Sequence, residues 1–273
     1  MPLPLFIVDA FTATAFRGNP AAVCLLTSPL PDQTLLSIAA EMNLSETAFL
    51  LPQSDTFQLR WFTPTTEVEL CGHATLASAH ILWETNTLRK DQPARFATKS
   101  GTLICTLLDN PNDRWIEMDF PAEAPFLIEE TTALLNALHH PILAAPPQKN
   151  RFDYLVELGD EQAVRDFVPD LPAIAKLPAR AVIITAHSHN PDYQFVSRFF
   201  GPAVGVTEDP VTGSAHCALA PYWCEKLNRA TLTAYQASGR GGILRLTYSP
   251  PRVKIAGQAL TIVSGHCIAP MPA

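Results

Sequence analysis

The sequence is short of charge. Only 16% of its 273 residues are Asp, Glu, Lys or Arg, whereas 47% are hydrophobic. A disordered chain needs the opposite balance, so this composition predicts a folded protein. Basic residues are also in the minority, with 19 Lys and Arg against 26 Asp and Glu. Because nucleic-acid binding depends on a basic surface, this deficit argues against a nucleic-acid partner.

Long apolar runs and paired cysteines are also missing. No stretch approaches the roughly 18 uninterrupted apolar residues that a membrane-spanning helix needs, so we expect no membrane partner. The N-terminus has no basic segment and reaches Asp9 almost at once, unlike a signal peptide. The six cysteines form no Cys-x-x-Cys pair and no disulfide-type spacing. We therefore expect reduced thiols and a cytoplasmic location.

Motifs that would hold a metal or a nucleotide are absent as well. The histidines at 139–140 and at 187 and 189 lack a third ligand at a usable spacing, and there is no His-Glu-x-x-His motif. We therefore expect no metal. The glycine-rich segment 239–242 does not fit the dinucleotide-binding pattern, and it is interpreted as a hairpin between strands.

Short apolar runs alternate with helical patterns along the chain. Leu, Ile and Ala at helical spacing predict helices near residues 35–42 and 74–82. Compact or alternating apolar segments predict strands, and the clearest of these are residues 6–11, 21–26, 57–62 and 243–248.

Part of the sequence is duplicated. Residues 66–84 align with residues 207–225 at an offset of 141, and the segments on both sides align at an offset of 138. An offset near half the chain length predicts two similar domains, each with a buried, alanine-rich helix. We place these domains at residues 1–124 and 125–258, with segment 259–273 as a candidate to rejoin the first.

Each repeat has a glycine, Gly72 or Gly213, at the start of its predicted helix. The first amides of a helix have no intrahelical partner and carry the positive end of its dipole. If a pseudo-twofold arrangement brings both helix starts together across an interdomain cleft, they can hold one anion, such as the carboxylate of a small molecule. The alternative is that the glycines only permit tight turns. Pro221, inside the second predicted helix, should kink it.

Reactive residue types gather around these helix starts. His73 follows Gly72, and its repeat partner is Ser214; Asp209 lies four residues before Gly213. Asp209 and Ser214 could instead be helix N-caps. Cys71 could be a base or a nucleophile at a helix N-terminus. Its repeat partner is Thr212, so a mechanism with two thiols is not available at these positions.

Six segments, in order along the chain, together resemble the phenazine-biosynthesis PhzF family, which has the diaminopimelate-epimerase-like fold. These segments are Asp9-Ala-Phe, Gly18-Asn-Pro-Ala-Ala-Val, Asn43-Leu-Ser-Glu-Thr-Ala-Phe, Phe62-Thr-Pro, Cys71-Gly-His-Ala-Thr and Glu208-Asp-Pro-Val-Thr-Gly-Ser-Ala. The resemblance implies an α+β fold of two pseudo-symmetric domains, each a curved, mostly antiparallel sheet or barrel wrapped around a central helix. It also implies a homodimer without cofactor or metal, and an active site between the domains.

The resemblance assigns roles to particular residues. It implies catalytic roles for Glu46, His73, Asp209 and Ser214, with Glu46 as the acid/base. It implies substrate binding by Asn19, Cys71, Gly72, Thr212 and Gly213. From the residues alone, Glu46 would be interpreted as an exposed or capping glutamate.

These expectations lead to a hypothesis of function. The chain is expected to be a cofactor-independent isomerase that moves a proton or a double bond on a small carboxylate-bearing metabolite. The founding members of the family act on a dihydro-hydroxyanthranilate, but membership does not assign that substrate to this chain. The alternatives are a racemase or epimerase that uses Cys71, and a non-catalytic small-molecule-binding or scaffold protein on the same fold.

Overall fold

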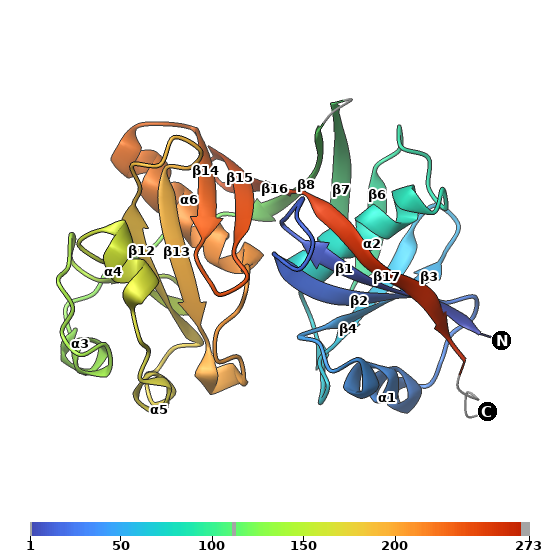
Figure 1. Ribbon diagram of the computed structural model, residues 1–273, viewed down its shortest axis with the longest axis horizontal. Coiled ribbons are helices and arrows are strands. Elements are labelled where there is room, and N and C mark those ends of the chain that lie inside the picture. The colour runs from blue at the N-terminus through green and yellow to red at the C-terminus, as the bar shows by residue number, and fades with distance from the viewer. Residues whose placement is uncertain (1, 111–112, 269–273) are drawn as a thin grey trace. The chain divides into compact units, whose positions relative to one another are not determined.

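The computed structural model describes residues 2–110 and 113–268. The chain forms two compact units, one made of Met1–Asp119 with Ala256–Ala273 and the other of Phe120–Ile255. The sequence prediction places the change of domain a few residues later, after residue 124. Each unit combines a strongly curved sheet with few helices, so the fold is α+β (Figure 1).

The first unit is built around the buried helix α2. Its β1 strand pairs antiparallel with both β2 and the C-terminal strand β17. Strand β2 runs parallel to β3, which begins a series that continues through β4 and β6 to β7. The elements are β1 (Leu3–Ala10), β2 (Asn19–Leu25), α1 (Asp32–Met42), β3 (Thr47–Pro52), β4 (Phe57–Phe62), β5 (Glu67–Val68), α2 (Gly72–Glu84), β6 (Ala94–Thr98), β7 (Gly101–Asn110), β8 (Asp113–Pro121) and β17 (Ala259–Cys267).

The second unit is built around α6 in the same way. Strand β11 runs parallel to β12, and the series continues through β13 and β14 to β15. The elements are β9 (Phe126–Leu127), α3 (Thr132–Ala137), β10 (Gln148–Lys149), β11 (Asp153–Glu157), α4 (Glu161–Asp166), α5 (Leu171–Ile174), β12 (Ala181–His187), β13 (Phe195–Phe200), the 3-10 turn η1 (Pro202–Val204), α6 (Gly213–Leu227), β14 (Thr231–Gln236), β15 (Gly242–Ser249) and β16 (Arg252–Gly257).

The central helices α2 and α6 are buried nearly all round, as their alanine-rich sequences predict. From His73 to Trp83, α2 exposes one residue, His80, to an intermediate degree. Small side chains let the strands approach the helix backbone closely, and α2 contacts β1, β2, β3 and β17. Helix α6 runs from Gly213 to Leu227 in spite of Pro221, so the proline does not end it. None of the helices in the described residues is both long and apolar enough to cross a bilayer.

The duplication seen in the sequence reappears in the pairing of the strands. In the first unit β4 runs parallel to β6 with Phe57 opposite Phe96, and in the second β13 runs parallel to β14 with Phe195 opposite Ala234. Both members of the second pair lie 138 positions after those of the first. The helix starts, Gly72 and Gly213, differ by 141. The two units are therefore pseudo-symmetric in topology as well as in sequence.

A repeated ion pair explains several of the matched residues. Arg60 Nε lies 2.8 Å from Glu67 Oε1, and Arg198 Nε lies 2.7 Å from Glu208 Oε1. In both pairs a second guanidinium nitrogen binds the other carboxylate oxygen. Each guanidinium also lies over a phenylalanine ring, that of Phe62 at 5.0 Å and that of Phe200 at 4.9 Å. The fork ties β4 in the first unit and β13 in the second to the segment that leads into the central helix.

Gly18 provides a test of the backbone just before β2. Its φ is +67°, and an added Cβ would lie 2.2 Å from the carbonyl oxygen of Ala10. Gly205 also has a positive φ, +82°, but open space where a Cβ would be. We expect Gly18→Ala to lower the free energy of unfolding by about 3 kcal/mol and Gly205→Ala by only about 1 kcal/mol, since the latter meets only the cost of the left-handed conformation. Urea unfolding of both variants measures these free energies. If both variants lose the same stability, the close contact with Ala10 does not destabilise Gly18→Ala.

Candidate active site

Glu46 lies in the short connection between α1 and β3. Helix α1 ends at a left-handed C-cap, Asn43, with φ of 49°, and β3 begins at Thr47. The carbonyl oxygen of Glu46 accepts a hydrogen bond from Ala22 on β2, at 3.3 Å, which fixes the backbone of this connection to the sheet. The side chain of Glu46 is 17% exposed, and its Oε2 atom is buried. The residues alone predict an exposed or capping glutamate, and that prediction is wrong.

Cys71 and His73 lie at the start of α2. Cys71 is the N-cap residue, in an extended conformation with φ of −145° and ψ of 110°, and His73 is the second residue of the helix. Both side chains are buried. Cys71 directly precedes the helix, and His73 lies two positions later in its first turn. Both side chains can therefore point to the same side of the helix start.

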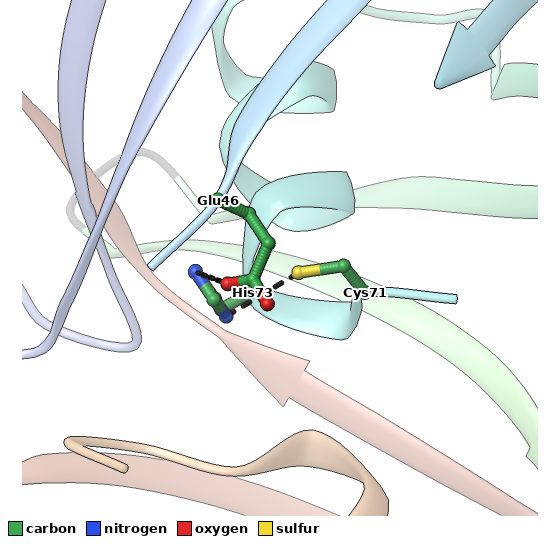
Figure 2. A group of neighbouring side chains, drawn as sticks. All are labelled: Glu46, Cys71 and His73. Carbon is green, nitrogen blue, oxygen red and sulfur yellow. Dashed lines mark hydrogen bonds and ion pairs between the residues drawn. The ribbon is translucent and has the colours of Figure 1, made fainter. Parts of the chain in front are cut away.

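The three side chains form one cluster, in which His73 contacts both Glu46 and Cys71 (Figure 2). His73 Nε2 lies 3.4 Å from Glu46 Oε2, and His73 Nδ1 lies 3.5 Å from Cys71 Sγ. The contact with Glu46 lacks the alignment of a hydrogen bond, since Nε2 makes none with any described residue. Burial lowers the pKa of His73 to about 3, so the ring is neutral at physiological pH. A carboxylate therefore lies against a neutral imidazole in a largely buried site.

Carboxylate, thiol and imidazole are also a donor set for a metal ion, and their ligand atoms lie within 4.8 Å of one another. A zinc ion binds each ligand atom at about 2.0–2.3 Å and takes one nitrogen of a given imidazole. Here the carboxylate is nearest to Nε2 and the sulfur is nearest to Nδ1. The expectation that no metal binds at these residues stays a prediction.

The matching loop of the second unit holds Asp209 and Thr212. Thr212 Oγ1 donates a hydrogen bond to Asp209 Oδ2 at 2.6 Å. The buried side chain of Gln236 binds both residues: its Nε2 donates to the carbonyl oxygen of Asp209 at 2.6 Å and to Thr212 Oγ1 at 3.1 Å. Its Oε1 accepts from the amide of Thr212 at 2.8 Å. The N-cap of α6 is Thr212, so the alternative of Asp209 or Ser214 as the cap is wrong.

Ser214 lies next to a partly buried ion pair. Its Oγ accepts a hydrogen bond from Arg180 Nη2 at 3.2 Å. Arg180 Nε in turn lies 2.8 Å from Oδ1 of Asp153, whose side chain is fully buried. The guanidinium also lies over the rings of Phe152 and Phe199. These contacts hold a cation beside the first turn of α6, where the helix dipole is also positive.

The remaining predicted binding residues also lie at the ends of elements. Gly72 and Gly213 are the first residues of α2 and α6, as predicted. Neither N-cap side chain, Cys71 nor Thr212, bonds to an amide of its own helix. The amides of the first turns are therefore not capped from within. Asn19 is fully buried at the start of β2, opposite Ala10 on β1.

Gln236 and Arg180 were not among the predicted site residues. Gln236 could have been noticed, because it continues the alternation of Leu232 and Ala234 on the buried face of β14, where a polar side chain needs a partner. Arg180 has no such signal, since its contacts with Ser214 and Asp153 join residues far apart in the sequence.

Comparison with known proteins identifies the family. The family model PhzC-PhzF, described as phenazine biosynthesis-like protein, matches residues 8–265. The chain belongs to the PhzC-PhzF family. A PhzC-PhzF relative from Halalkalibacterium halodurans, named as an uncharacterized isomerase, is 49% identical over 270 residues, covering 98% of this chain and 99% of that protein.

Solved structures agree with this assignment. A PhzF-family protein from Enterococcus faecalis has a TM-score of 0.92 at 39% identity, covering 98% of this chain and 100% of that chain. A hydroxyproline epimerase from Agrobacterium vitis has a TM-score of 0.58 at 11% identity, covering 97% of this chain and 92% of that chain. The second likeness shows the fold alone. Together they confirm the predicted PhzC-PhzF resemblance and its epimerase-like fold.

Proposed function

We propose that this chain is a cofactor-independent isomerase of the PhzF type, in which Glu46 moves a proton between two carbons of a small carboxylate-bearing metabolite. The observation that carries the proposal is the position of the Glu46 carboxylate, with one oxygen buried and 3.4 Å from a neutral imidazole. The relatives named as isomerases support the reaction class.

The proposed reaction needs a base that can return its proton. Glu46 removes a proton from a carbon next to a double bond, the double bond moves, and the same carboxyl group delivers the proton to another carbon on the same face. One C–H bond is broken and one is formed, so no electron acceptor is needed. A carboxylate suits this role because it can both take a proton and return it. His73 lies beside it at 3.4 Å and is neutral, so it places no positive charge against the carboxylate.

The proposal gives the remaining predicted residues the task of holding the substrate. The uncapped amides at Gly72 and Gly213 suit a carboxylate, since they are donors at the positive ends of α2 and α6. Asp209 is proposed to bind a polar substituent, in the orientation that Thr212 and Gln236 maintain. Ser214, beside the Arg180 guanidinium, is proposed to contribute to binding the anionic end.

Exchange of carbon-bound protons with solvent tests this function. We expect the protein in deuterium oxide to place deuterium on carbon in a suitable small unsaturated carboxylate, and the first compound to try is a dihydro-hydroxyanthranilate. Mass spectrometry and proton NMR of the recovered compound measure the label. If a carboxylate shifts the amide resonances of Gly72 and His73 but exchanges no carbon-bound proton, the protein binds without isomerising, and the proposal is wrong.

A second candidate function, an epimerase, is favoured by one observation: Cys71 lies in the same cluster as Glu46. The hydroxyproline epimerase that shares the fold was solved with trans-4-hydroxy-L-proline bound. The same deuterium assay with that compound separates the two reactions. An epimerase inverts one carbon and labels it there, whereas the proposed isomerase moves a double bond and places the label on a different carbon.

A further inference from the structure

Cys71 is a buried thiol at the site that the proposed reaction does not use. It is 6% exposed, and its Sγ lies 3.5 Å from His73 Nδ1 (Figure 2). We infer that the Cys71 thiol donates a hydrogen bond to His73 Nδ1 and so fixes the His73 tautomer that presents Nε2–H to Glu46. The inference rests on the proposed function, because it takes Glu46 as an ionised base.

The direction of each contact follows from the donor inventory. An ionised carboxylate only accepts hydrogen bonds, so a proton on Nε2, which lies 3.4 Å from Glu46 Oε2, is electrostatically favoured over a lone pair there. A neutral imidazole has one N–H donor and one acceptor nitrogen. Once Nε2 carries the proton, Nδ1 is therefore the acceptor, and among the described residues the group in contact with it is Cys71 Sγ. The thiol must then be the donor.

Burial makes this choice of tautomer matter. Burial keeps His73 neutral, with its pKa lowered to about 3, so the ring cannot satisfy both neighbours by taking a second proton. In the other tautomer the lone pair of Nε2 would lie 3.4 Å from the Glu46 carboxylate, and two acceptors would be close together in a largely buried site. That arrangement would disfavour the ionised base. Cys71 thus acts through His73, as a positioning residue.

The second unit does not repeat this device. At the position of Cys71 it has Thr212, whose hydroxyl donates to Asp209, and at the position of His73 it has Ser214. The helix N-terminus is common to both units, but the combination of thiol and imidazole occurs next to Glu46. We expect this difference between the units if the thiol serves Glu46, because only the first unit contains that acid/base group. If the thiol only capped a helix, we would expect it at both helix starts.

The tautomer can be measured directly by long-range ¹H–¹⁵N NMR of the histidine rings, with the His73 signals assigned from a His73→Gln variant. We expect wild-type His73 to show the Nε2–H pattern at neutral pH. Cys71→Ser, which keeps a donor, should show the same pattern. Cys71→Ala should show a mixture of both tautomers or the Nδ1–H form. Cys105→Ala, which removes a fully buried thiol on β7 away from the site, is the matched control and should match wild type.

Turnover should follow the tautomer. We expect Cys71→Ala to lower kcat by roughly 3-fold to 10-fold with little change in KM, the size of one lost hydrogen bond, and Cys71→Ser to stay within about twofold of wild type. An Nδ1–H tautomer in wild type, or an unchanged Nε2–H tautomer in Cys71→Ala, would overturn the inference. Neither tautomer result shows whether carbon-bound protons exchange with solvent. The tautomer inference and the proposed isomerase activity can therefore be rejected separately.

Discussion

Replacing Glu46 by Gln should lower kcat by a factor on the order of 10² or more while the fold and ligand binding are retained, the usual range for losing a general acid/base. Gln has nearly the same shape as Glu and can still accept hydrogen bonds. What it loses is the ability to take and return a proton. The measurement is turnover of the compound that shows solvent deuterium exchange, together with the rate of that exchange.

Two further variants make the result specific. Glu41→Gln removes the carboxylate of an exposed residue at the end of α1, a few residues before the site, and should leave turnover unchanged. Cys71→Ser should be much milder than Glu46→Gln, because the reaction proposed here needs the thiol only as a hydrogen-bond donor. An epimerase that uses Cys71 as a base predicts the reverse order. An inactive Cys71→Ser beside an active Glu46→Gln would show that Glu46 is not the base.

The fold could be predicted from the sequence because the duplicated residues make the same contacts in both units. The matched residues Arg60 and Arg198 form the same forked ion pair in each unit, with Glu67 and Glu208. Spacing showed that these residues recur, but not that they bind each other. Likewise, alanines in the two central helices indicated burial all round, which the structure confirms for α2 and α6.

The candidate site could be predicted only in part. His73 and Cys71 stand out because they flank a glycine at a helix start, a local pattern. Glu46 has no local pattern, and the family resemblance was needed to select it. Its position depends on the left-handed turn at Asn43 and on a hydrogen bond to Ala22, which is distant in sequence. Gln236 depends in the same way on a contact with Thr212 made across the second unit.

Two buried histidines should make the protein sensitive to mild acid. Burial lowers the pKa of His73 to about 3 and that of His216 to about 4. His216 is fully buried in α6, where its Nδ1 lies 2.7 Å from the carbonyl oxygen of Thr212. In the unfolded chain both histidines titrate near 6.5. Below that pH the unfolded state therefore binds more protons than the folded state, and stability falls as the pH falls.

The size of this effect depends only on the pKa of each histidine in the unfolded chain, because in the folded protein both histidines have pKa values below about 5 and stay neutral over this range. Between about pH 7.5 and about pH 5, each histidine should remove about 2 kcal/mol from the free energy of unfolding of its unit, since one pKa unit corresponds to about 1.4 kcal/mol. Glu67, whose pKa is lowered to about 2 chiefly by its hydrogen bond to Arg60, loses its contribution only at lower pH, below about 4.5.

His216→Gln therefore provides the sharper test, since His73 also has the Glu46 carboxylate against it. Urea unfolding followed by the indole resonance of Trp223, which lies on the same helix as His216, reports on the second unit. We expect the loss of stability between about pH 7.5 and about pH 5 to be smaller by about 2 kcal/mol in His216→Gln than in wild type. His266→Gln, at an exposed position on β17, should leave the loss unchanged. If wild type and His216→Gln lose equal stability over this range, His216 is not held neutral by its burial in the folded protein.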